Sequence, residues 1–125
     1  MSFDQSVNCL SLEAGSDLSA AQHLFVDVAT DKQVDVVATK GAKAVGVLQD
    51  KPAAAGRIGS VAIGGITKVK AGAAFNAGAE LISTAAGKAI VTDAVNQYIM
   101  GTALEAATAD GDIVAMIINR YQRSA

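Results

Sequence analysis

His23 and Cys9 are the side chains of this sequence best suited to acid–base or nucleophilic chemistry. Each is the only residue of its type, which leaves no pair of histidines or thiols to hold a metal ion. A catalytic cysteine needs a nearby base that lowers the pKa of its thiol, and nothing in the sequence places His23 beside Cys9. We therefore interpret His23 as a surface or interface histidine and Cys9 as a small thiol that is buried or half-buried.

Acidic residues and glycine-rich segments are two other possible sources of chemistry. Asp27, Asp31 and Asp35 are spaced by four, and in a β-hairpin they would be solvated strand and turn residues. No two acids stand out as a pair that faces one cleft, the arrangement that glycoside hydrolysis requires. The glycine-containing segments 56–59 and 64–65 match neither the phosphate-loop nor the dinucleotide-binding spacing. The sequence thus predicts no enzymatic activity, no cofactor and no metal site.

The charge pattern argues against nucleic-acid and membrane partners. The chain has 10 basic and 12 acidic residues, a formal net charge of −2, and its basic residues are scattered along the sequence. Tight binding to a phosphate backbone needs clustered cations. The N-terminus lacks the basic and apolar regions of a signal peptide, and uncharged stretches such as 94–104 are about half of the ~20 residues of a membrane-spanning helix. Synthesis in a cytoplasm is therefore expected.

Turn signals recur every 8–14 residues, which is typical of a small all-β domain. At 125 residues the chain fits one domain with one core. The glycines at 64–65 predict a bulge or a sharp bend inside a long strand. The alanine-rich stretches 71–79 and 104–109 leave room for at most one or two short helices. The predicted strands are residues 22–29, 33–38, 43–49, 57–71, 80–85, 88–92, 97–104 and 111–118.

The last predicted strand is apolar on both faces, since residues 113–118 contain no polar side chain. A strand of this kind must be covered on both sides. One face can meet the core of the domain, and the other is covered either by a neighbouring subunit or by the same domain if the strand is central. Both alternatives stay open from the residues alone. Val114, Met116 and Ile118 are the candidate oligomer interface.

Four stretches, taken in order, resemble a family of small phage- and prophage-encoded head proteins, the capsid decoration or cement proteins. No single motif is distinctive, and the ordered set carries the resemblance. The stretches cover most of residues 14–118. The first is Ala14-Gly15-Ser16-Asp17-Leu18-Ser19, and the second runs from Val45-Gly46-Val47-Leu48-Gln49-Asp50 to Gly56. The third runs from Gly65-Ile66-Thr67-Lys68 to Ala74, and the fourth from Gly101-Thr102-Ala103-Leu104 to Val114.

The resemblance implies a mainly β fold, a small single-domain sandwich or barrel of tulip-like shape. It implies a homo-oligomer, often a trimer, that binds the major capsid protein on the outer surface of an icosahedral head and stabilises the capsid lattice. In some decoration proteins an N-terminal arm pairs with the capsid. The expected layout is therefore an arm over 1–13, a β domain over 14–119 and a solvated tail over 120–125, with Ser2, Phe3, Val7 and Leu10 as candidate capsid contacts.

Two other functions compete with capsid decoration. One is another structural role in the virion, such as the base of a head fibre or a minor tail component. The other is a small carbohydrate- or ligand-binding β module, for which Tyr98 and Tyr121 are the candidate stacking residues. Two tyrosines without any tryptophan make a poor stacking platform, so this alternative has the weaker support.

Overall fold

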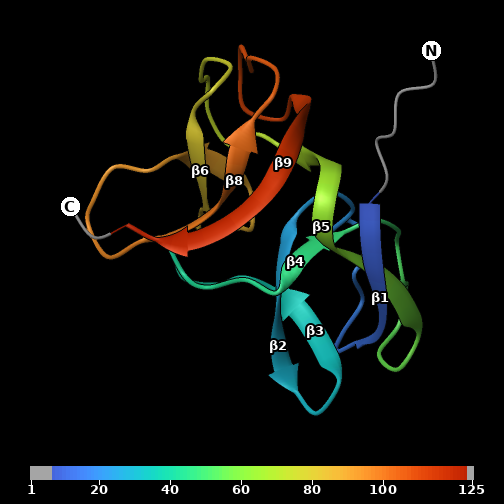
Figure 1. The fold of residues 1–125 in the computed structure, drawn as a ribbon. Helices are drawn as coiled ribbons and strands as arrows, with labels where there is room; N and C mark the ends of the chain where they lie inside the picture. Colours follow the sequence, from blue (N-terminus) through green and yellow to red (C-terminus); the bar gives the residue numbers. More distant parts are fainter. Residues whose placement is uncertain (1–6, 124–125) are drawn as a thin grey trace.

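The protein is built from nine strands, with no helix among the residues that the structure describes (Figure 1). The computed structural model describes residues 7–123. The prediction of a small, mainly β fold is confirmed, and each predicted strand overlaps an observed one, although β2 and β9 continue past the predicted ends at residues 29 and 118. The strands are β1 (Val7–Ala14), β2 (Phe25–Thr30), β3 (Gln33–Val36), β4 (Gly46–Leu48), β5 (Ile58–Lys70), β6 (Glu80–Ser83), β7 (Ala89–Val91), β8 (Tyr98–Ala103) and β9 (Ile113–Gln122).

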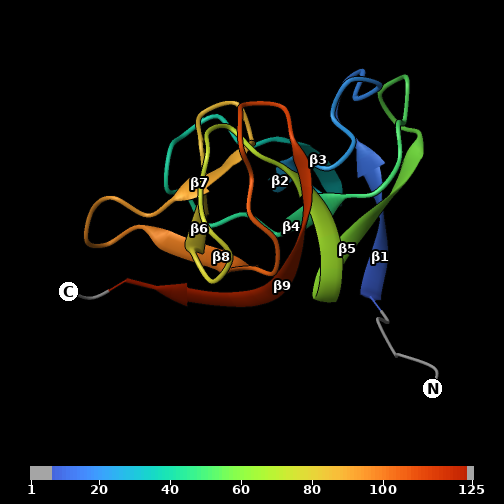
Figure 2. The ribbon, with the colours of Figure 1, turned by 90° about the horizontal axis from the view of Figure 1, so that it is seen from above.

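The strands form one hydrogen-bonded series in the order β1-β3-β2-β4-β5-β9-β8-β6-β7. β1 also pairs with β5, so the pairings of β1, β3, β2, β4 and β5 close on themselves. In the second half, Ala71, the residue after β5, forms a bridge with Ala89 of β7. β5 is therefore shared by both halves: in Figure 1, β6, β8 and β9 lie above the strands of the first half. In the view from above in Figure 2, β9 lies between β5 and the group of β6, β7 and β8.

A bend at Gly64-Gly65 lets β5 serve both halves. Residues 58–65 pair with β1, and residues 66–70 pair with β9. The β1–β5 register skips Ile63, because Asn8 pairs with Gly64 while Cys9 pairs with Ala62. Gly65 has a φ of +83°, which a residue without a Cβ adopts at little cost. The predicted bulge is confirmed, and it redirects the strand between the two halves.

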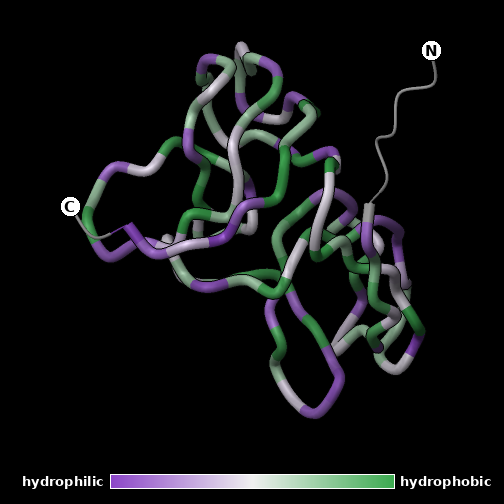
Figure 3. Tube along the Cα trace, in the orientation of Figure 1, coloured by the Kyte–Doolittle hydropathy of each residue, from purple (hydrophilic) through white to green (hydrophobic). Residues whose placement is uncertain are grey.

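Each half has its own apolar core, made mostly of small and β-branched side chains. The core of the first half includes Leu18, Val26, Val34, Leu48 and Val61. The core of the second half also takes in Phe25 and Val47 from the first half, and its larger side chains include Leu81, Met100 and Met116. Figure 3 shows these hydrophobic segments along the strands, whereas the tip of the β2–β3 hairpin is hydrophilic.

The turn that leads into β9 is held by one carboxylate. Asp112 Oδ2 accepts hydrogen bonds from the backbone N–H and the hydroxyl of Thr108, both 2.8 Å, and from the N–H of Ala109. These bonds, above all the one from the Thr108 N–H, lower the pKa of Asp112 below its ordinary value. The ionised carboxylate therefore favours the folded state.

We expect Asp112→Asn to lower the melting temperature at neutral pH, with the gap from the native chain closing in acid. A carboxyl whose pKa is lower in the folded state stabilises the fold above its unfolded pKa, and this contribution is lost as the pH falls through the folded pKa. Circular-dichroism melts from about pH 7 to about pH 2 measure the gap. Asp31→Asn is the control, because no group within residues 7–123 donates a hydrogen bond to the Asp31 carboxylate. A gap that is constant with pH would contradict the prediction.

Candidate interaction surfaces

β1 has one open edge over most of its length. Residues 7–13 pair with β5 on one side, whereas only Glu13 and Ala14 pair with β3 on the other. The expected N-terminal arm of residues 1–13 is thus strand β1 from residue 7 onward, because its backbone is hydrogen-bonded into the sheet. Of the candidate capsid contacts, Leu10 is 45% exposed on this strand and Val7 is its first residue. Ser2 and Phe3 lie outside the described residues.

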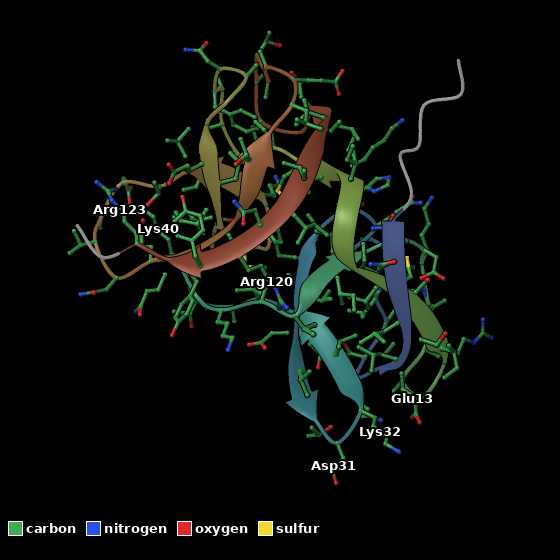
Figure 4. All side chains as sticks on the ribbon, in the orientation of Figure 1. Glu13, Asp31, Lys32, Lys40, Arg120 and Arg123 are labelled. Carbon is green, nitrogen blue, oxygen red and sulfur yellow. The ribbon has the colours of Figure 1, made fainter. Side chains whose placement is uncertain are left out.

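The expected C-terminal tail also begins inside the sheet. Residues 120–122 belong to β9, where Tyr121 and Gln122 pair with β8. Arg120 donates hydrogen bonds from Nη1 to the carbonyl oxygens of Ala44 and Val45, each 3.2 Å, and so ties β9 to the segment before β4 (Figure 4). This arginine is therefore a cross-link between the two halves, contrary to the expectation of a solvated tail.

The candidate oligomer-interface residues on β9 face the core of the protein, so only the other face of the strand is open to a neighbour. Val114 and Met116 are buried in the core of the second half, and Ile118 packs against that core. These three side chains point to the face of β9 that meets this core, where another copy of the chain cannot reach them. The apolar side chains that β9 exposes are Ile113 and Ile117, at 43% and 40%.

Cys9 is exposed, whereas the sequence predicted a buried or half-buried thiol. The open edge of β1 explains the difference, since no strand covers that side of the residue. His23 is half-buried, lies just before β2 and has a φ of +68°. Its amide donates to Leu48 O at 2.8 Å, and its carbonyl accepts from the amide of Lys70 at 2.9 Å. These two bonds hold the histidine in a backbone conformation that non-glycine residues seldom adopt.

His23 lies between two hollows whose rims carry lysines. One, of about 610 Å³, is lined by Gln49, Ile66, Thr67, Lys68, Leu104, Glu105 and Ala115 together with His23. The other, of about 480 Å³, is lined by Ser19, Ala20, Gln22, Lys51, Lys70 and Ile113 together with His23. Burial, followed by the charges of Lys68 and Lys70, lowers the pKa of His23 and outweighs a hydrogen bond with the Lys68 backbone. The imidazole is therefore neutral at neutral pH.

Two carboxylates stand directly opposite each other on the β2–β3 hairpin. Asp27 pairs with Asp35, and both line a hollow of about 290 Å³ beside Val28, Val36 and other hairpin residues. Asp35 accepts a hydrogen bond of 2.6 Å from the Ser16 hydroxyl. No lysine or arginine within residues 7–123 forms an ion pair with either acid. This pair was not predicted, although the hairpin register that creates it follows from the valine pattern.

The two tyrosines considered for sugar stacking do not share a face. Tyr98 pairs with Gln122, and Tyr121 pairs with Ile99 in the adjacent position, so their side chains point to opposite sides of the sheet. The Tyr121 hydroxyl donates to the Glu80 carboxylate, which raises the pKa of Tyr121. Within residues 7–123 no group of three or more potential metal ligands is gathered. No helix in that range has the length and hydropathy of a membrane span.

Comparison with known proteins places this geometry in a family. No curated protein matches the sequence. Among solved structures, the N base of the head fibre protein gp8.5 of bacteriophage phi29 matches with a TM-score of 0.72 and 18% identity. The match covers 96% of this chain and all of that one, and it shows that the two share a fold. A phage cement protein family matches residues 13–118. The chain belongs to this family of phage cement proteins and is a structural protein of a phage virion.

Proposed function

We propose that the protein binds the outer surface of an icosahedral phage head as a homo-oligomer, a trimer, and stabilises the capsid lattice. The observation that carries this proposal is the match to the phage cement family over residues 13–118, which spans both halves of the fold. Its partners would be the major capsid protein and further copies of itself. We assign it no catalytic role, and we expect it to be made in the host cytoplasm.

The exposed apolar side chains support a protein that works by binding. Leu10, Ile58, Ile113 and Ile117 are all at least 40% exposed on strands. Such exposed apolar side chains are candidates for contact with a partner where they gather into a patch. A ligand that binds the assembled shell and not the free subunits shifts the equilibrium toward the shell, by roughly 2.7 kcal/mol per site at 100 times its dissociation constant. An oligomer that makes several such contacts at once gains further affinity from their high effective concentration.

Heads coated with this protein are expected to survive heating better than bare heads of the same phage. The measurement is DNA release against temperature for heads that lack the protein, with and without the purified chain added back. A chain without residues 2–6 tests the proposed contact of the N-terminal segment, since this deletion leaves β1 intact. The heat-denatured chain is the control. An unchanged release temperature with the protein bound at saturation would contradict the stabilising role.

A head-fibre base is the second candidate function, and the shared fold with the phi29 head fibre base favours it. The two roles differ in what the outer end of the molecule holds. A fibre base connects to a further fibre domain, whereas a cement protein acts alone. Cryo-electron microscopy of particles separates them, because density that extends outward beyond this fold would identify a fibre and a bare knob would identify a cement protein.

A further inference from the structure

The two hollows beside His23 form a cationic surface whose charges are not neutralised within the described chain. Lys51, Lys68 and Lys70 line the hollows, and none of the three forms an ion pair within residues 7–123. The one carboxylate on these rims, Glu105, accepts a hydrogen bond of 2.7 Å from the Ala115 N–H through Oε1. The lysines therefore outnumber the acids, and we call the surface that Lys51, Lys68 and Lys70 form around the neutral His23 the cationic surface.

Two features of His23, which lies within the cationic surface, are unfavourable for folding. His23 has a φ of +68°, a backbone conformation that non-glycine residues seldom adopt. Its Nδ1 is buried and has no hydrogen-bond partner among residues 7–123, which is unfavourable for a polar atom. Backbone strain and unpaired polar atoms concentrate at positions with a function. The strain therefore indicates that the cationic surface does more than complete the fold.

The β2–β3 hairpin carries negative charges that no ion pair within residues 7–123 neutralises. Like charges directly opposite each other on paired strands are destabilising, and Asp27 and Asp35 are such a pair. Asp31 adds a third carboxylate at the tip, where it points into solvent (Figure 4). Val28, 50% exposed, points to the other face of the hairpin. The hairpin projects from the rest of the molecule in Figure 1, so a neighbour can reach it.

The charges of these two surfaces are complementary. His23 lies two residues before β2, Lys68 and Lys70 lie on β5, and Asp27 lies within β2. Because β2 is extended and runs away from His23, the hairpin cannot fold back onto the cationic surface of its own chain. We propose that the acidic β2–β3 hairpin of one copy docks on the cationic surface of the next copy. The contact is head-to-tail, a type that generates a closed ring when the rotation between copies closes. This inference rests on the self-association proposed above and names the surfaces that carry it.

Apolar side chains next to the charges favour a polypeptide over a free anion as the occupant. Leu104 and Ile113, 45% and 43% exposed, line the hollows that the lysines surround. A contact with an apolar centre and complementary charges at its rim gains specificity and association rate from the charges.

Charge reversal on either surface tests the contact in the full-length chain. Lys51→Glu with Lys68→Glu places acids opposite acids, and Asp27→Lys with Asp31→Lys places lysines opposite lysines. We expect each pair to raise the dissociation constant of self-association at least about tenfold. The four changes together restore the attraction and the native formal net charge of −2, and they are expected to return the constant to within about threefold of the native value. Sedimentation equilibrium measures the constants, and circular dichroism verifies that each variant is folded.

The control is Lys43→Glu with Arg57→Glu, which changes the net charge as much as the lysine pair does but lies outside both surfaces. It should leave self-association within about threefold of native. The inference is overturned if the control weakens association as strongly as the lysine pair, if the four-fold variant stays dissociated, or if the native chain is monomeric. Binding of the same variants to heads is measured separately. Loss of self-association with head binding retained would therefore reject the contact and leave the capsid role standing.

Discussion

Replacing Gly46 by alanine is expected to lower the free energy of unfolding by about 3 kcal/mol or more. β4 crosses so close to β5 that a Cβ on Gly46 would stand 2.0 Å from the carbonyl oxygen of Ala62. That oxygen belongs to the backbone of the strand shared by both halves, so no side-chain rotation relieves the clash. Overpacking of a core by a single methyl group usually costs 1–3 kcal/mol, and a backbone clash lies at the upper end or beyond it.

Gly64→Ala is the matched control for the Gly46 variant. It adds the same methyl group in β5, but its nearest neighbour is the side-chain nitrogen of Asn8 at 3.4 Å, an ordinary contact. We expect a change within about 1 kcal/mol. Urea denaturation followed by far-ultraviolet circular dichroism measures both, since the chain has no tryptophan for fluorescence. A Gly46 variant as stable as native would show that β4 and β5 do not approach this closely.

The strand content was predictable because it depends on neighbours in the sequence. Alternation of apolar residues and punctuation by turn residues located β2, β3 and the β6–β7 hairpin. The hairpin pairings follow directly, since short loops leave few registers. The alanine-rich stretches were ambiguous on the same local criteria. The structure places Ala71 and Phe75 in bridges with Ala89 and Ala107, so tertiary pairing decides where helix propensity could not.

The pairing of β1 was not predictable, because its partners are distant in sequence. Val7 pairs with Gly65 and Glu13 with Ile58, a register fixed by the bend in β5 and by no local signal. Apolar and polar residues alternate over 7–13, as they would in an arm that pairs with another protein. In this chain the partner of these residues is β5. A sequence pattern establishes that a segment is extended, but not whether its partner belongs to the same chain.

The candidate surfaces were predictable only in part for a similar reason. Asp27 faces Asp35 once Val28 is paired with Val34, so the acidic pair could have been read from the hairpin. Lys68 and Lys70 share a face by simple alternation. Lys51 and His23 join them from a loop and from a strained turn, and their convergence depends on how the two halves meet.

Replacing Met116 by alanine is expected to cost about 2–5 kcal/mol of unfolding free energy, whereas Ile117→Ala is expected to cost less than about 1 kcal/mol. The two residues are adjacent in a strand that is apolar on both faces, so the sequence cannot say which side chain is in the core. Met116 is fully buried between Thr67 of β5 and Ala103 of β8. Removal of its side chain leaves a cavity that the paired strands cannot close.

Ile117 faces the opposite way and keeps 40% of its surface exposed, so its truncation removes little buried area. Urea denaturation of both variants at the same protein concentration measures the difference, and sedimentation shows whether either change alters self-association. Comparable losses for the two variants in a monomeric state would mean that β9 is covered on both faces by its own chain. In that case Ile113 and Ile117 would be core residues, and the exposed face of β9 could not serve as a contact surface.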